Sequence, residues 1–146
     1  GFVHDRMMDL AAESVLVTVR QMNAGTVKTR RQEDSKATPA PKIFQKDCAI
    51  PWSEPAEDVH NHIRGLSPYP GAWTMHGDTR LKVYRSQIAN GNGPPGEVLQ
   101  SNDRLIVACG TGAVELDVVQ QPGKRRLPTE DFLNGYALEV GERLEF

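Results

Sequence analysis

The chain has 146 residues and a mass of 16.1 kDa, which is enough for one globular domain with a short appendage. Hydrophobic residues make up 38% and charged residues 25% of the chain, a balance typical of a folded, soluble protein rather than a disordered one. The formal net charge of −2 does not by itself indicate nucleic-acid binding, and no apolar run is long enough to span a membrane. The N-terminus lacks the basic start and the apolar stretch of a signal peptide.

Residues 2–24 are predicted to form an amphipathic helix. Apolar residues recur at steps of three and four, from Phe2 to Met22, and Gly25 supplies a stop signal. An apolar stripe of this kind needs a surface to pack against, and that surface need not belong to this chain. The following residues, 26–41, contain almost no large apolar side chain and are rich in charged residues, Thr and Pro. We interpret them as a linker that joins two units.

Residues 42–146 have the pattern of short strands and turns, in keeping with 13 glycines and 10 prolines in the chain. Strands are predicted over 72–76, 81–88, 96–100, 104–109 and 113–119. Two short helices are predicted, one capped by Ser53 and ending near Leu66, the other capped by Thr129 and covering 130–135. The connections between strands are too short for crossover helices. The predicted fold class is therefore mainly β: a small OB-like antiparallel barrel with short helices, preceded by an N-terminal helix and a linker.

Basic side chains gather locally, although residues 42–146 carry 11 lysines and arginines against 14 aspartates and glutamates, a net charge of −3. The local groups are Lys124-Arg125-Arg126 in a loop, Lys82 and Arg85 in one strand, and Lys42 and Lys46 at the start of the unit. Such groups bind phosphates when they converge on one face, whereas most charge runs simply face solvent. Trp52, Trp73, Tyr69 and Tyr84 are of the type that stacks on bases, although aromatic residues in a small barrel more often belong to the core.

No catalytic or metal-binding constellation stands out. His60 and His62 are two residues apart on a predicted helix, so their side chains point to different faces, and we expect no metal site. No G-x-S-x-G elbow is present, and the glycine turn at 110–112 lacks the lysine of a phosphate loop. Cys48 and Cys109 are interpreted as buried or free thiols of a reducing compartment.

The most specific stretch is HNHIRGLSPYPGAWT at residues 60–74. It closely resembles the start of the C-terminal domain of the methionyl-tRNA formyltransferase family. Further matches to this family are Ala40-Pro41-Lys42-Ile43, Asp47, Ile50-Pro51-Trp52, Leu81-Lys82-Val83-Tyr84, Pro95-Gly96-Glu97-Val98 and Gln121-Pro122-Gly123-Lys124-Arg125. Residues 2–25 resemble the last helix of the family's catalytic domain. Pro39 and Pro51 depart from the family pattern and alter only the expected geometry of the linker.

The resemblance implies that the chain is a C-terminal portion, with 1–25 as the terminal helix of a truncated catalytic domain, 26–41 as linker and 42–146 as the OB-like domain. The family transfers a formyl group from 10-formyltetrahydrofolate to methionine on initiator tRNA. Its catalytic residues and folate pocket lie in the preceding domain, so this chain is expected to be inactive alone and to hold no cofactor. The implied partners are initiator methionyl-tRNA and the missing catalytic domain, in the cytoplasm. A dimer formed through the exposed N-terminal helix is a further expectation.

In this family a basic inner face of the C-terminal domain holds the tRNA. Carried over to this sequence, the resemblance implies Lys42, Lys82, Lys124 and Arg125 as tRNA-binding residues, with Lys46, Arg64, Arg85 and Arg126 as weaker members. The alternative is a structural or assembly module of a related sugar-nucleotide or folate formyltransferase or hydrolase, with no nucleic-acid role. Basic residues that converge on one face would favour tRNA binding, and scattered ones would favour the alternative.

Overall fold

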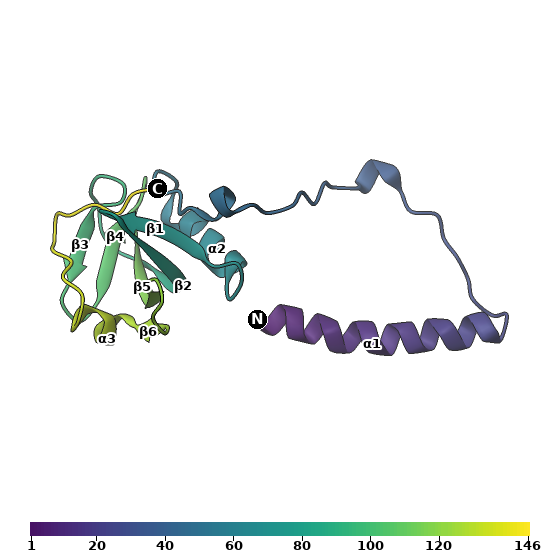
Figure 1. Ribbon diagram of the computed structural model, residues 1–146. Coiled ribbons are helices and arrows are strands. Elements are labelled where there is room, and N and C mark those ends of the chain that lie inside the picture. Colours follow the sequence, from purple (N-terminus) through teal and green to yellow (C-terminus); the bar gives the residue numbers. More distant parts are fainter. The chain divides into compact units, whose positions relative to one another are not determined.

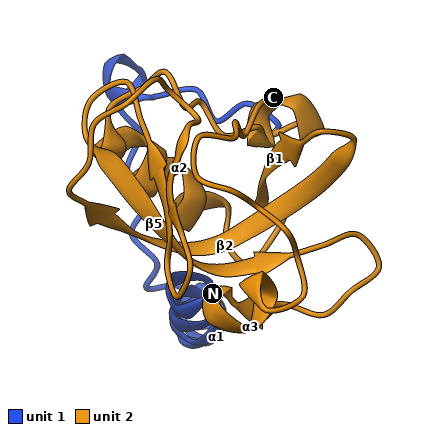
Figure 2. Cartoon of the chain, turned by 90° about the vertical axis from the view of Figure 1, so that its left-hand side faces the viewer, with its two compact units in different colours: residues 1–42 blue, residues 43–146 orange.

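The computed structural model describes residues 1–146 as two compact units, Gly1–Lys42 and Ile43–Phe146 (Figure 1, Figure 2). In the first unit, α1 (Phe2–Asn23) is a regular helix that buries none of its side chains. The helix is followed by Gly25, whose φ of 65° lets the Thr26 amide turn back and donate to the Gln21 carbonyl. A short 3-10 helix, η1 (Asp34–Lys36), interrupts the extended residues that follow. None of the helices has the length and apolar character needed to cross a membrane.

The second unit is built on one antiparallel sheet. Its strands are β1 (Ala72–His76), β2 (Thr79–Ala89), β3 (Val98–Ser101), β4 (Leu105–Ala108), β5 (Ala113–Gln120) and β6 (Leu127–Pro128). The strand order is β1-β2-β5-β4-β3, and β6 pairs with β5. The long strand β2 curves across the unit (Figure 2), and the register of its pairing with β5 shifts on both sides of Arg85. The predicted fold class, a mainly β, OB-like antiparallel barrel with short helices, is confirmed.

The C-terminal segment closes the curled sheet. Residues 141–145 lie between the two edge strands, β1 and β3. Met75 exchanges two backbone hydrogen bonds with Glu145, at 2.7 and 2.8 Å, and the Leu144 amide donates to the Gly96 carbonyl at 2.8 Å. Because the unpaired groups of both edges find partners in the same segment, the open sheet becomes a partly closed barrel.

Helix α2 (Ala56–Leu66) covers the sheet, and its buried side chains, including Val59 and Ile63, join the core contributed by β2, β4 and β5. The core also contains one polar connection. The indole N–H of Trp52 donates to the Thr74 hydroxyl at 3.0 Å, and this hydroxyl donates to the Glu145 carbonyl at 2.8 Å. Thr74 is fully buried, so these bonds satisfy a polar group that would otherwise destabilise the fold.

The two predicted helix caps are wrong. Helix α2 begins at Ala56 after Pro55, and its first amide is satisfied by the Thr111 carbonyl at 2.9 Å instead of by the Ser53 side chain. Helix α3 (Thr129–Leu133) includes Thr129 as its first residue, and the Thr129 hydroxyl donates to the Leu116 carbonyl of β5. At α2 a carbonyl group from a distant part of the chain replaces the local cap. At α3 the predicted capping residue lies inside the helix, and its hydroxyl is bonded to β5. Sequence spacing alone predicts neither arrangement.

Candidate nucleic-acid interface

The β1-β2 hairpin directs one row of side chains into the core and the next row to the outer surface. In β2, Leu81 and Val83 are buried, whereas Arg80 and Lys82 are partly exposed. In β1, Trp73 lies between two buried neighbours and is paired across the hairpin with Lys82. The period-two alternation of a strand therefore brings two cations and an indole to the same outer surface.

Trp73 and Arg80 form a stacked pair on this surface. The Arg80 guanidinium carbon lies 4.3 Å from the centre of the Trp73 ring. The Trp73 indole N–H donates to the Gln45 carbonyl at 2.8 Å, which holds the ring against η2 (Gln45–Cys48). Because the cation rests on an aromatic ring and not on a carboxylate, its charge is not neutralised and its N–H groups can still meet an anion.

Tyr84 and Arg126 form a second stacked pair, with the guanidinium carbon 3.7 Å from the ring centre. The Tyr84 hydroxyl donates to the Gln120 side chain at 2.6 Å, and the amide group of Gln120 donates to the Lys124 carbonyl at 2.6 Å. Arg126 also donates to the Pro68 carbonyl at 3.1 Å. These contacts tie together β2, the end of β5, the 121–124 turn and the loop that precedes β1.

A pocket of about 270 Å³ opens beside these pairs. Its lining consists of the two β2 cations and the turn after β5: Arg80, Lys82, Gln120, Gln121, Pro122 and Gly123. Lys82 donates one hydrogen bond, at 3.1 Å, to the Pro70 carbonyl. Two cations and two amide side chains around one hollow are donors suited to phosphate oxygens. We name the surface formed by Arg80, Lys82, Arg126, Trp73 and Tyr84 the basic face.

The basic face carries uncompensated positive charge on a unit that is acidic overall. None of its three cations takes part in an ion pair. By contrast, further along the sheet Arg104 is paired with Glu115 and lowers the pKa of that carboxyl group, chiefly through a side-chain hydrogen bond. The three cations of the basic face therefore keep a positive charge that no carboxylate pairs with, unlike Arg104.

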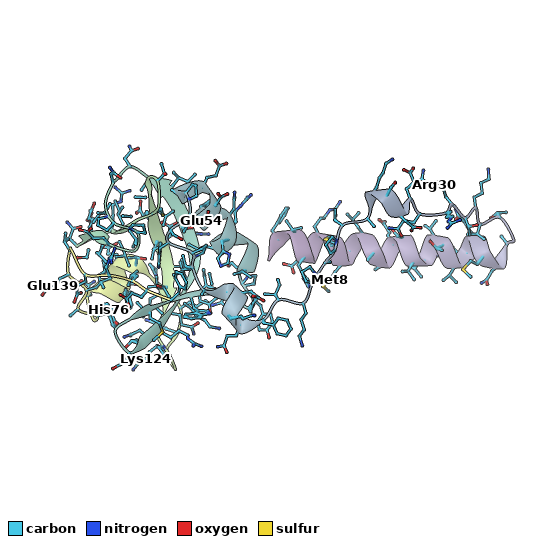
Figure 3. All side chains as sticks on the ribbon, turned by 90° about the horizontal axis from the view of Figure 1, so that it is seen from above. Met8, Arg30, Glu54, His76, Lys124 and Glu139 are labelled. Atoms are coloured by element: carbon cyan, nitrogen blue, oxygen red, sulfur yellow. The ribbon has the colours of Figure 1, made fainter.

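The sequence-predicted site residues divide between this face and its surroundings. Lys82 and Arg126 belong to the basic face, and Lys124 and Arg125 follow directly after its pocket, with Lys124 at the surface of the unit (Figure 3). Lys46 lies in η2, next to the residue that binds Trp73.

The other predicted residues are not among those that define the basic face. Arg64 is near the end of α2 and donates to the Asn61 side chain at 2.8 Å. Arg85 is exposed at the irregularity of β2, opposite Val118. Lys42 is the last residue of the other unit. Some basic residues are therefore scattered over the chain, whereas Arg80, Lys82 and Arg126 share one surface. Only this second group includes arginines that stack on aromatic rings.

Sequence reasoning missed Arg80. It expected aromatic residues of a small barrel to belong more often to the core, and Tyr84 is indeed buried while Trp73 packs against the core, but each ring also has a face that stacks on an arginine. Arg80 is two residues before Lys82, so the strand alternation that exposes Lys82 also exposes Arg80. The role of Trp73 depends on Gln45, which is 28 residues away. No local pattern carries that information.

The remaining reactive groups do not form a site. Burial raises the pKa of the Cys109 thiol to about 11. Burial also raises the pKa of Cys48, with a further increase from Asp47 and a decrease from Lys82. Both thiols are therefore protonated near neutral pH and are poor nucleophiles. No three His, Cys, Asp or Glu residues are grouped so as to hold a metal ion.

The fold and this surface define an OB-like β unit with a cationic, aromatic outer face. Residues 42–137 match the family described as formyl transferase, C-terminal domain, and the chain belongs to this family.

The relatives that the chain matches include methionyl-tRNA formyltransferases. The chain is 41% identical over 140 residues to the methionyl-tRNA formyltransferase of Citrifermentans bemidjiense, a match that covers 95% of this chain and 44% of that protein. It is 44% identical over 139 residues to the methionyl-tRNA formyltransferase of Roseobacter denitrificans, with the same coverage of 95% and 44%. The chain therefore spans less than half the length of these relatives.

Among solved structures, HypX from Aquifex aeolicus has a similar fold. The TM-score is 0.65 at 22% sequence identity, over 86% of this chain and 24% of that one. At this identity the similarity concerns the fold alone.

Proposed function

We propose that this chain is the C-terminal, tRNA-binding module of a methionyl-tRNA formyltransferase. The observation that carries the proposal is that Arg80, Lys82 and Arg126 are not ion-paired and belong to one surface. Arg80 and Lys82 line its pocket, and Arg80 and Arg126 each stack on an aromatic ring. The relatives named methionyl-tRNA formyltransferase supply the identity of the RNA. The longer enzyme, a cytoplasmic protein of translation initiation, transfers formyl from 10-formyltetrahydrofolate to methionine on initiator tRNA, with catalytic residues that precede this chain.

In this proposal the basic face positions the tRNA and does not read its sequence. Lysine and arginine side chains neutralise backbone phosphates and release counterions, which gives affinity without base specificity. The acidic remainder of residues 43–146 repels RNA elsewhere, so the cationic end of the sheet sets the orientation of the bound molecule. An oriented tRNA presents its acceptor end to the catalytic part of the enzyme.

We further propose that residues 1–25 are the terminal helix of the catalytic domain, 26–41 the linker and 42–146 the OB-like domain. Helix α1 buries nothing although it carries several large apolar side chains, among them Met8, which Figure 3 labels. In this proposal the apolar stripe packs against the catalytic domain, since the matched region is only 44% of the longer relative. Without this cover, the same helix is expected to support a dimer.

A salt titration of initiator tRNA binding tests the function. The triple variant Arg80→Gln, Lys82→Gln, Arg126→Gln removes the three cations of the basic face, and the control Arg20→Gln, Lys28→Gln, Arg143→Gln removes three cations elsewhere. Both variants change the net charge equally. We expect the first to weaken binding by roughly tenfold or more and to reduce the slope of log K against log salt by about 2 to 3, at about 0.7–0.9 per phosphate contact.

The control should bind tRNA as the unaltered chain does. Equal losses in both triple variants would mean that net charge, and not the basic face, governs binding. If the unaltered chain does not bind tRNA even at low salt, the alternative of a structural or assembly module replaces the tRNA-binding function.

A further inference from the structure

The loop at residues 67–71 presents one aromatic side chain to solvent. This loop joins α2 to β1 and lies in the most specific stretch of the sequence. Tyr69 at its centre is 87% exposed, the highest value among the exposed large hydrophobic side chains of the chain. An aromatic ring in this position contributes nothing to the core, so packing does not account for a tyrosine here.

The backbone on both sides of Tyr69 is held by cations of the basic face. Arg126 donates to the Pro68 carbonyl and Lys82 donates to the Pro70 carbonyl, each at 3.1 Å. The loop is also anchored at its end, where the Gly71 amide donates to the Leu66 carbonyl at 2.8 Å.

Gly71 lets the loop approach the basic face closely. Its φ is 88°, and a Cβ at this position would come within 3.1 Å of the Tyr84 ring. The exposed ring of Tyr69 is therefore carried by a backbone that is held against Lys82, Tyr84 and Arg126 of the basic face.

We propose that Tyr69 is a stacking platform for an unpaired nucleobase of the bound RNA. The inference rests on the tRNA-binding function and deepens it. Unpaired bases stack on exposed aromatic rings while neighbouring phosphates meet basic side chains. Lys82 links the two parts of such a site. It holds the Tyr69 loop through the Pro70 carbonyl, and it lines the pocket with Arg80, where a phosphate would bind.

The unpaired positive charge beside the Tyr69 loop favours RNA over a protein as the molecule that contacts this ring. The cations beside the loop contact carbonyl groups and aromatic rings, and none is neutralised by a carboxylate. A nonpolar protein surface placed on Tyr69 would bury this charge without a counterion, which is unfavourable. A nucleotide supplies both a flat ring and an anion.

The test compares single-stranded with double-stranded RNA, using the full 146-residue chain. The probes are a 12-nucleotide oligouridylate and a blunt-ended RNA duplex of the same length, and the variants are Tyr69→Ala, Tyr69→Phe and Tyr69→Trp. We expect Tyr69→Ala to weaken oligouridylate binding by about 5- to 100-fold, the range of one lost base–aromatic stack, while duplex binding changes less than about twofold. Tyr69→Phe and Tyr69→Trp should retain binding, because each keeps a flat ring.

Three further measurements make the result specific to stacking. The salt slope of Tyr69→Ala should equal that of the unaltered chain, since stacking releases no counterions. Phe146→Ala, which removes another exposed aromatic ring, should bind both RNAs normally. Oligouridylate carrying 4-thiouridine should crosslink to a peptide containing residues 67–71.

Failure of this inference and failure of the function give different results. If the basic-face triple variant loses RNA but Tyr69→Ala binds oligouridylate normally, the stacking role is wrong and tRNA binding stands. If Tyr69→Ala weakens both RNAs equally and lowers the salt slope, the loop only supports the cations, and stacking is again wrong. If the unaltered chain binds none of the oligouridylate, the RNA duplex and the initiator tRNA, the proposed tRNA-binding function itself is wrong.

Discussion

Arg126 shows how one residue serves both the structure and the charge of the basic face. Its guanidinium stacks on Tyr84 and donates to the Pro68 carbonyl, and the group has five N–H donors in total. A planar, delocalised cation can therefore hold the loop and still meet a phosphate. The arrangement depends on arginine itself, and not merely on a positive charge.

This dependence predicts different effects for two substitutions of Arg126. Arg126→Lys keeps the charge but loses the planar stack and the forked donors, so tRNA affinity should fall by roughly three- to tenfold with an unchanged salt slope. Arg126→Gln should also lower the slope by about 0.7–0.9, because one phosphate contact disappears. Fluorescence titrations at several salt concentrations measure both quantities. A lysine variant with full affinity would show that stacking on Tyr84 is irrelevant to binding.

The buried thiols predict slow alkylation. The raised pKa values of Cys109 and Cys48 keep both thiols protonated at pH 8, and burial also blocks the reagent. We expect iodoacetamide to label both residues at least about tenfold more slowly in the folded chain than in guanidinium chloride. Mass spectrometry of tryptic peptides measures each rate separately. Equal rates in the two states at either cysteine would contradict its burial.

At the scale of the element, the strands and turns could be predicted because their signals are local. The alternation of Leu81 and Val83 with Lys82 marks β2, and the Gly77-Asp78 turn marks its hairpin with β1. The predicted cap at Ser53 fails because the Thr111 carbonyl, in the turn before β5, accepts from the first amide of α2. The predicted cap at Thr129 fails because this residue lies inside α3 and its hydroxyl donates to the Leu116 carbonyl of β5. Local rules give the elements, and long-range partners decide how the elements end.

The candidate site divides in the same way. Lys82 and the 124–126 cluster follow from strand alternation and from a short basic run. The stacking of Arg126 on Tyr84 and of Arg80 on Trp73 requires segments that only the folded sheet brings together. Closure of the barrel is similarly nonlocal, because Gly96 and Leu144 are far apart in sequence.

This closure makes Gly96 sensitive to substitution. Its φ is 83°, and a Cβ at this position would collide with the carbonyl oxygen of Leu144. The amide of the same residue, Leu144, donates to the Gly96 carbonyl and so pairs the C-terminal segment with the sheet. We expect Gly96→Ala to lower the free energy of unfolding by about 2 kcal/mol or more, through strain and loss of the segment's bonds. Urea denaturation followed by circular dichroism provides the measurement.

Gly65 provides the matched control for Gly96. It lies within α2, and a Cβ there has no neighbour within 4 Å. Gly65→Ala should stabilise the chain by about 0.5–1 kcal/mol, since alanine favours the helix. If Gly96→Ala is as stable as the unaltered chain, the C-terminal segment does not close the barrel as described.

At the scale of the whole molecule, the two units differ in what holds them together. The core runs from Cys48 to Leu144, so residues 43–146 contain all of it. Every residue of the first unit is exposed. The second unit thus has the buried surface of an independently folding domain, whereas α1 has an apolar stripe and no core.

Deletion of residues 1–42 tests this difference. Because the deletion removes no core side chain, the remaining unit should unfold cooperatively with a Tm within about 3 °C of the full chain, where 1 kcal/mol corresponds to roughly 4–8 °C for a domain of this size. The full chain should also self-associate as its concentration rises, since α1 exposes apolar residues, and the shortened chain should stay monomeric in sedimentation experiments. A Tm lower by about 10 °C or more would show that residues 1–42 stabilise the barrel. Self-association that survives the deletion would place the contact on the second unit and remove α1 as its cause.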